Sequence, residues 1–194
     1  MEIIFATSNT GKLKEVRNIF SKSEIKIISL SELGFDEEIE ETGSTFEQNA
    51  FIKAETIYEK YKISVMADDS GLAVEQLNNE PGVYSARYAG ENATYADNNK
   101  KLKDELLSFQ APHYAQFVCC AVFVNENTRI SVLEKLDGEI ITEFKGKNGF
   151  GYDPIFKPRN SNITLAEMSL KNKNKISHRA RAFNLLYEKI VKLS

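Results

Sequence analysis

Long hydrophobic runs are missing from this sequence of 194 residues. No run approaches the roughly 20 consecutive apolar residues that a helix needs to span a bilayer, so no membrane anchor is expected. The chain opens directly into an apolar segment, without a basic stretch followed by a cleavage site, so no signal peptide is expected either. We therefore predict a cytoplasmic protein.

The sequence also lacks a charge excess and has little cysteine. Net charge is -3, with 25 Lys and Arg against 28 Asp and Glu, so nothing in the composition indicates a nucleic-acid-coating protein. The two cysteines, Cys119 and Cys120, are adjacent in an apolar segment that reads as a buried strand, and a disulfide between them would be strained. No second cysteine pair exists and the two histidines lie far apart, so we expect buried thiols and no metal role for them.

No internal repeat, low-complexity tract or Pro/Gly-rich linker divides the chain, so one domain over residues 1–194 is predicted. Apolar runs typical of strands alternate with helical periodicity, and a strand-rich section follows, which predicts an α/β protein with a mixed sheet. The expected strands are residues 3–6, 25–30, 63–67, 71–77, 117–124, 129–135 and 139–144. The expected helices follow Lys12 or begin at Thr45, Thr94, Thr164 and Ser177.

Two adjacent carboxylates, Asp68 and Asp69, end an apolar run and are followed by Ser70 and Gly71. Side chains alternate along a strand, so we expect the two carboxylates to point to opposite sides. Mg²⁺ often binds one or two carboxylates together with phosphate oxygens, which makes this pair a candidate metal site. Asp, Ser and Gly also favour turns, and the segment on its own is better explained as a turn, an interpretation that the other segments described below reverse.

A second polar segment, residues 7–12, joins a strand to a helix. A helix N-terminus offers unpaired N–H groups and a partial positive charge, and hydroxyls, Gly11 and Lys12 add donors without bulk, which suits a phosphate. The segment is too short for a Walker loop and lacks its terminal Lys-Ser/Thr pair. Capping of the helix by Ser8, Asn9 or Thr10 explains the same residues equally well.

Acidic residues precede the helix that begins at Thr45, where capping and the helix dipole favour them. An inward-facing glutamate of this segment (Glu38, Glu40 or Glu41) would also serve as a second oxygen ligand for a cation held by Asp69. Lys53 lies about two turns into the helix, on the side of Asn49; as a lone lysine it is expected on the surface.

The loop that contains Arg87 mixes rigid, aromatic and cationic residues. Arg87 would pair with a phosphate or brace the acidic site, although on its own it is expected at the surface. Residues 150–154 place two aromatics around a glycine, before a proline that restricts the backbone. Such a segment suits a flat purine, and a packed aromatic turn is the competing interpretation.

Basic residues concentrate between residues 171 and 181. Ser177 fits a helix N-cap, which places His178 and Arg179 in a first turn where the dipole disfavours cations. An anionic or carbonyl-rich ligand would compensate for them, and a solvated basic face is the alternative.

Six ordered segments of the chain together resemble the inosine triphosphate pyrophosphatase family, bacterial dITP/XTP pyrophosphatases that clear deaminated purine nucleotides. The segments are ATSNTGK, EETGSTFEQNAFIKA, ADDSGLAV, PGVYSARYAG, GFGYDPIF and TLAEMS with KNKISHRARA, and they run from residue 6 to residue 182. The resemblance implies an elongated mixed sheet flanked by helices, with two lobes and a central cleft for the substrate, and a homodimer. It also implies Mg²⁺-dependent hydrolysis of ITP, dITP and XTP to the monophosphate and pyrophosphate, which cleanses the nucleotide pool.

The resemblance further implies roles for individual residues. Asp69 is implied as catalytic base and metal ligand, Asp68 as its support and Glu41 as second metal ligand, with Glu40 left open. Lys12 and Lys53 are implied to contact phosphate. Residues implied to hold the phosphate tail or contact substrate are Thr7, Ser8, Asn9, Thr10, Gly11, Lys12 and Ser70. Residues implied to enclose or read the base are Phe150, Gly151, Tyr152, Asp153, Lys173, His178 and Arg179.

The sequence departs from the family pattern in two places. Asn78-Asn79-Glu80 replaces the usual glycines, so a less tight loop is expected there, and residues 170–172 are more basic than is common. Two other functions remain to be weighed. A pyrophosphatase for pyrimidine or modified nucleotides is disfavoured by residues 177–179, and a nucleotide-binding regulatory module without turnover by the intact acidic and lysine residues. The sequence does not show which of ITP, dITP and XTP is the preferred substrate, or whether ribose or deoxyribose is preferred.

Overall fold

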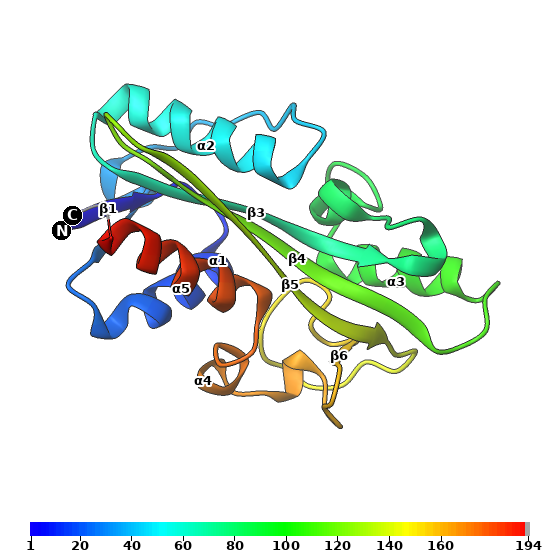
Figure 1. The fold of residues 1–194 in the computed structure, drawn as a ribbon. Coiled ribbons are helices and arrows are strands. Elements are labelled where there is room, and N and C mark those ends of the chain that lie inside the picture. The colour runs from blue at the N-terminus through cyan, green and yellow to red at the C-terminus, as the bar shows by residue number, and fades with distance from the viewer. Residues whose placement is uncertain (193–194) are drawn as a thin grey trace. The chain divides into compact units, whose positions relative to one another are not determined.

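The structure is a computed structural model that describes residues 1–192. The strands are β1 (Glu2–Phe5), β2 (Lys26–Ser29), β3 (Val65–Val74), β4 (His113–Val124), β5 (Arg129–Ile140) and β6 (Phe156–Pro158). The helices are α1 (Thr10–Ile19), α2 (Phe46–Tyr61), α3 (Tyr95–Leu106), α4 (Leu170–Lys173) and α5 (His178–Val191). In the sheet the strand order is β2-β1-β3-β4-β5-β6 (Figure 1). Because β1 is parallel to β2 and β3 while β6 is antiparallel to β5, the predicted mixed α/β fold is confirmed.

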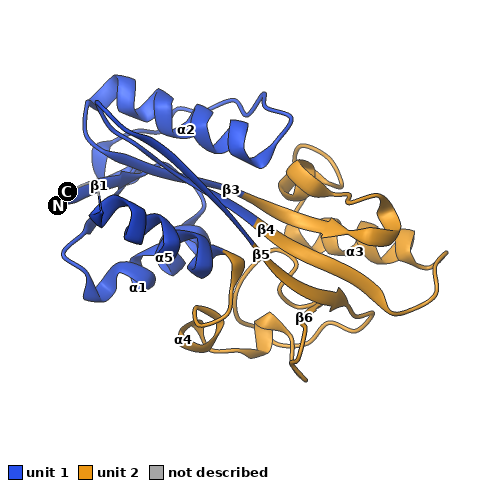
Figure 2. Ribbon diagram, viewed as in Figure 1, with its two compact units in different colours: residues 1–69, 119–134, 179–194 blue, residues 70–118, 135–178 orange. Residues whose placement is uncertain are grey.

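The chain forms two compact units (Figure 2). Unit 1 comprises residues 1–69 and 119–134 and the C-terminal residues from Arg179 onward. Unit 2 comprises residues 70–118 and 135–178. Strands β3, β4 and β5 each contribute residues to both units. Within residues 1–192 the structure has no helix long and apolar enough to cross a membrane.

Unit 1 buries both faces of its part of the sheet, with α2 on one side and α1 and α5 on the other (Figure 1). Ile3 and Phe5 of β1 pack with α1 and α5, whereas Ile4 and Ala6 pack with α2. Such alternation follows from the period of two along a strand. With both faces covered, the strands are almost continuously apolar, which is why they were predictable.

Unit 2 has a single core. It is built from Leu72 and Val74 of β3, Leu102 and Leu106 of α3, and apolar residues of β4, β5, β6 and the loop before β6. Tyr114 of β4 lies on the opposite face of its strand and is exposed.

The largest correction concerns β3. A turn at Asp68–Gly71 between two short strands is the better explanation from the sequence alone, but this prediction is wrong because one strand runs from Val65 to Val74. Its carboxylates have cationic and amide partners from distant parts of the chain, and such tertiary contacts override the local turn preference.

A similar correction applies to β5, which is one strand where two were expected, while residues 141–144 leave the sheet. Gly138 lies inside it, and a Cβ there would come within 2.4 Å of the carbonyl oxygen of Lys157 on β6. Strand β6 has only three residues and was not predicted.

In the loop after β3, Asn78 and Asn79 adopt backbone conformations that usually require glycine. Asn78 and Asn79 have φ values of 54° and 68°, in the left-handed region that asparagine tolerates better than most residues. The loop is closed by hydrogen bonds from the Val74 N–H to the Glu80 carbonyl (3.0 Å) and from the Asn79 N–H to the Val74 carbonyl (2.9 Å).

Candidate active site

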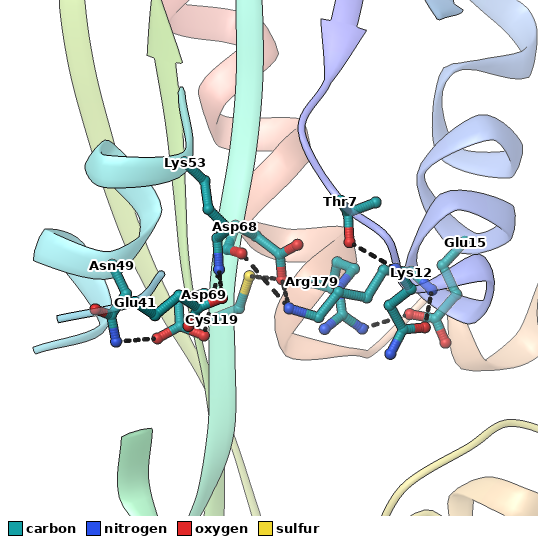
Figure 3. A network of polar contacts seen from close by, with 11 residues as sticks. Thr7, Lys12, Glu15, Glu41, Asn49, Lys53, Asp68, Asp69, Cys119 and Arg179 are labelled. Atoms are coloured by element: carbon teal, nitrogen blue, oxygen red, sulfur yellow. Dashed lines mark hydrogen bonds and ion pairs between the residues drawn. The ribbon is translucent and has the colours of Figure 1, made fainter. Parts of the chain in front are cut away.

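The two adjacent carboxylates of β3 point to opposite sides of the strand, as predicted (Figure 3). On one side, the Asp68 Oδ2 atom lies 3.2 Å from the Lys12 Nζ atom and 3.2 Å from the Arg179 Nε atom. On the other side, the Asp69 carboxylate accepts a hydrogen bond from the Asn49 Nδ2 atom (3.2 Å) and lies 3.8 Å from the Lys53 Nζ atom. All of these residues belong to unit 1.

Asp68 belongs to a buried set of four charges. Arg179 also contacts the Glu15 carboxylate at 2.7 Å, so two cations and two carboxylates balance one another. Burial by itself would raise the pKa of Asp68, but Lys12 and Arg179 outweigh it and hold the pKa well below its ordinary value. Asp68 therefore stays ionised and is suited to fixing the position of the cations around it.

Asp69 has a different electrostatic environment. Burial raises the pKa of Asp69 above its ordinary value, and the nearby charge of Glu41 adds to this, while Lys53 and Lys12 oppose it. A carboxylate with a raised pKa accepts a proton more readily than an ordinary one, which suits a general base.

Asn49 ties Asp69 to the loop that carries Glu41. Its Oδ1 atom accepts a hydrogen bond from the Gly43 N–H (2.8 Å), while its Nδ2 atom donates to Asp69. A Cβ at Gly43 would lie 2.6 Å from the Asn49 Oδ1 atom, so the loop depends on glycine there. The predicted helix start is confirmed, because Thr45 caps α2 by accepting a hydrogen bond from the Gln48 N–H.

Lys53 connects the two carboxylates that are candidate metal ligands. Its Nζ atom lies 2.7 Å from Glu41 and 3.8 Å from Asp69, and its side chain is buried, contrary to what a lone lysine suggests. Within residues 1–192 no three His, Cys, Asp or Glu side chains cluster around a possible metal position. Two carboxylates nevertheless fit Mg²⁺, which usually completes its octahedron with water and phosphate oxygens. Glu40 is exposed, so the geometry favours Glu41 as the partner of Asp69.

Residues 7–12 form the junction between β1 and α1, and capping by Asn9 is confirmed. The Asn9 Oδ1 atom accepts a hydrogen bond from the Lys12 N–H (3.1 Å), and the Asn9 N–H donates to the Thr7 hydroxyl (3.2 Å). Ser8 and Thr10 are exposed, and Thr7 and Gly11 are partly exposed. Phosphate binding by this junction remains a prediction.

In unit 2, a loop of residues 149–153 wraps around the buried Asp153 carboxylate. Its Oδ2 atom accepts a hydrogen bond from the Phe150 N–H (2.8 Å) and forms an ion pair with Lys173. The Lys173 Nζ atom lies 4.9 Å from the centre of the Phe150 ring. Gly149 has a φ of 75°, and a Cβ there would come within 2.0 Å of Asp153.

A block of residues 81–90 supports the same loop. The Tyr152 hydroxyl donates to the Ser85 carbonyl (2.9 Å), and the Ser85 hydroxyl accepts a hydrogen bond from the Leu72 N–H (2.8 Å). Arg87 pairs with Glu91 and lies over the Tyr84 ring, as expected for a surface residue.

The basic segment divides into two groups. Lys173, His178 and Arg179 are buried, whereas Lys171, Lys175 and Arg181 are exposed. The His178 ring stacks on Phe117 of the same unit with a centroid distance of 4.7 Å. The carboxylates of Glu15 and Asp68 compensate the charge that Arg179 brings to the start of α5. Ser70 follows Asp69 on β3 and is partly exposed.

Sequence reasoning missed Glu15, Cys119 and Asn99. Glu15 lies three residues after Lys12 on α1 and is buried, although a glutamate in this amphipathic helix is expected on the polar face. The Cys119 thiol donates to the Asp68 Oδ2 atom at 3.7 Å, a contact that no local pattern indicates.

Comparisons with known proteins find relatives over nearly the full length of the chain. The model of the Ham1 family matches residues 3–189. A dITP/XTP pyrophosphatase of Thermoanaerobacter pseudethanolicus is 49% identical over 193 residues, which cover 99% of this chain and 98% of the relative. The dITP/XTP pyrophosphatase of Bacillus subtilis is 45% identical over 188 residues, which cover 95% and 94%. Among solved structures, the Ham1 protein of Staphylococcus aureus matches with a TM-score of 0.87 and 42% identity over all of both chains. A HAM1 protein from Coxiella burnetii matches with a TM-score of 0.88 and 40% identity over 99% of both.

Proposed function

The chain belongs to the Ham1 family, and we propose that it hydrolyses non-standard purine nucleoside triphosphates (ITP, dITP and XTP) to the monophosphate and pyrophosphate. The names of relatives 45–49% identical over nearly the full length support this activity. The observation that carries the proposal is the arrangement around Asp69, a carboxylate of raised pKa beside Lys53 and Glu41. A nucleotide-binding module without turnover is not favoured, because such a module has no need of a carboxylate tuned in this way.

In the proposed mechanism, Asp69 orients a water molecule and accepts its proton as the water attacks phosphorus, and the P–O bond of the bridge between the α and β phosphates breaks to release the monophosphate and pyrophosphate. Asn49 fixes the Asp69 carboxylate, since its amide is itself held by the Gly43 backbone. Lys12 and Lys53 offset the negative charge that the triphosphate brings and that the transition state redistributes. Asp68, which stays ionised, holds Lys12 in place for this task.

Magnesium is part of the same proposal. Glu41 and Asp69 would hold the ion, which would supply Lewis-acid stabilisation of the phosphate oxygens. Base selectivity would come from unit 2, where Phe150 and Tyr152 would enclose a purine and Lys173 and His178 would read a 6-keto oxygen. A 6-amino group would leave such donors unpaired, and this mismatch costs orders of magnitude in selectivity. We also propose that the protein acts in the cytoplasm as a homodimer.

The test is pyrophosphate release from ITP, XTP, dITP, GTP and ATP, measured with Mg²⁺ and with EDTA. We expect metal-dependent release from the three deaminated nucleotides, and a loss of about 10²–10⁴-fold in kcat for Asp69→Asn, because the general base is gone. Asp104→Asn, on the exposed surface of α3, is the matched control and should keep full activity. Release of orthophosphate in place of pyrophosphate would refute the mechanism. ITP binding without turnover by the wild-type protein would support the regulatory module.

A further inference from the structure

Asn99 of α3 is a buried amide with an uncommon set of contacts. Its Nδ2 atom donates to the Gly151 carbonyl (2.9 Å), 52 residues further along the chain, and to the Tyr95 carbonyl (2.8 Å) in its own helix. The Asn99 side chain therefore connects the first turns of α3 to the loop of residues 149–153. All of these residues belong to unit 2.

The same helix touches this loop at a second point. The rings of Tyr95 and Phe150 lie with their centres 6.2 Å apart. Gly151, whose carbonyl Asn99 binds, has a φ of 61° and lies between the two aromatic residues of the loop. The hydrogen bond to this carbonyl therefore fixes the peptide that joins Gly151 to Tyr152, while the Tyr95 ring contacts Phe150 on the other side of the glycine.

The oxygen side of the Asn99 amide carries an energetic cost. Its Oδ1 atom is buried and has no hydrogen-bond partner among residues 1–192. A buried acceptor without a partner is destabilising, and such groups call for an explanation. Leucine has nearly the same shape as asparagine, and Leu102 and Leu106 of the same helix already line the core of unit 2. A leucine at position 99 would avoid the unsatisfied oxygen but would lose the bond to Gly151.

We propose that Asn99 is a positioning residue that holds the loop of residues 149–153 in its binding geometry by a hydrogen bond to the Gly151 carbonyl. This inference rests on the proposed function, which assigns Phe150 and Tyr152 to the purine base. Contacts with the base are the same in the ground state and in the transition state of phosphate hydrolysis, so loosening the loop raises KM and leaves kcat unchanged.

The test compares Asn99→Leu with the wild-type protein by two independent readouts. Hydrogen–deuterium exchange without nucleotide should show faster exchange of the Phe150 and Asp153 amides, which are hydrogen-bonded within the loop. Steady-state kinetics should show KM for ITP raised roughly 3- to 10-fold, the equivalent of one lost hydrogen bond, at unchanged kcat. Asn99→Ala gives the same comparison if the leucine variant does not fold.

Asn98→Leu is the matched control, because Asn98 is an equally buried neighbour on the same helix. Its side chain bonds the Ala86 carbonyl (2.9 Å) and the Ala89 N–H (2.7 Å) and not the loop of residues 149–153 itself. The control should melt at a lower temperature, and it should change loop exchange and KM less than Asn99→Leu does, because it reaches the loop only through the block of residues 81–90. Unchanged exchange of the Phe150 and Asp153 amides in Asn99→Leu would overturn the inference, as would an equal rise of KM in the control.

The two proposals fail in distinguishable ways. A wild-type protein that does not hydrolyse ITP would refute the proposed function, while faster loop exchange in Asn99→Leu would still support the positioning role. Unchanged exchange together with active wild-type enzyme would refute only the role of Asn99.

Discussion

Glu15→Gln is the sharpest test of the buried charge set, because it removes one charge and preserves the shape of the side chain. In the wild-type protein two carboxylates, Glu15 and Asp68, balance Lys12 and Arg179. The variant leaves one positive charge in excess among side chains that water scarcely reaches. Breaking a buried pair by removing one partner costs about 3–5 kcal/mol. We take about 3 kcal/mol, because Arg179 keeps its contact with Asp68.

The assay is thermal unfolding. For a chain of this size 1 kcal/mol corresponds to roughly 2–4 °C in Tm, so Glu15→Gln should lower Tm by roughly 6–12 °C. Glu2→Gln is the control, because Glu2 forms an exposed pair with Lys26 and exposed pairs contribute little. Its Tm should stay within about 2 °C of the wild-type value.

A second variant separates charge balance from simple loss of contacts. In the double variant Glu15→Gln with Arg179→Met, Asp68 and Lys12 remain as a balanced pair, so Tm should recover part of the loss caused by Glu15→Gln alone. A Tm for Glu15→Gln within about 2 °C of the wild-type value, no larger than the change expected of the control, would refute the reasoning. The reasoning would also be refuted if the double variant lost more stability than the two single variants lose when their effects are added.

Two further predictions concern cysteine and glycine. Burial raises the pKa of Cys120 to about 12 and that of Cys119 well above its ordinary value, so both thiols stay protonated at pH 8. Ellman's reagent should therefore label neither cysteine in the folded protein and both in denaturant. Rapid labelling of the native protein would contradict this prediction. Gly149→Ala places a side chain on a residue with left-handed backbone conformation and forces it against Asp153, so the variant should be less stable by about 1–2 kcal/mol and should have a higher KM for ITP. An unchanged Tm and unchanged kinetics would show that the loop tolerates a side chain there.

Local signals were sufficient to predict where α2 and α3 begin, whereas α4 was not predicted and the helix expected from Thr164 is a single 3₁₀ turn over Leu165–Glu167. Thr45 and Thr94 cap α2 and α3 through their own side chains, so the sequence contains both the cap and the helix it starts. The opposite orientation of Asp68 and Asp69 was equally predictable, because the period of two is a property of every strand.

Long-range partners were not predictable in this way. The continuity of β3 through four residues that favour turns depends on Lys12 and Arg179, which lie 56 and 111 residues from Asp68 in the chain. Glu15 was missed for the same reason, since no residue near it in the sequence indicates that its partner is the buried Arg179. The site was recognisable only because several weak local signals occurred in a familiar order, and none of them fixed a contact.

Strand geometry gives the two neighbouring carboxylates different chemistry. A general base must be able to take up a proton, and the two cations beside Asp68 prevent this by holding its pKa well below the ordinary range. Asp69, on the other side of the same strand, has a raised pKa, because burial and Glu41 outweigh the opposing charges of Lys53 and Lys12. Neighbouring residues of a strand face opposite sides, so a shift of β3 by one residue would turn Asp68 toward Glu41 and Asp69 away from it. In the proposed mechanism Asp68 therefore acts without touching the substrate, because it holds Lys12, which offsets the phosphate charge, while Asp69 accepts the proton.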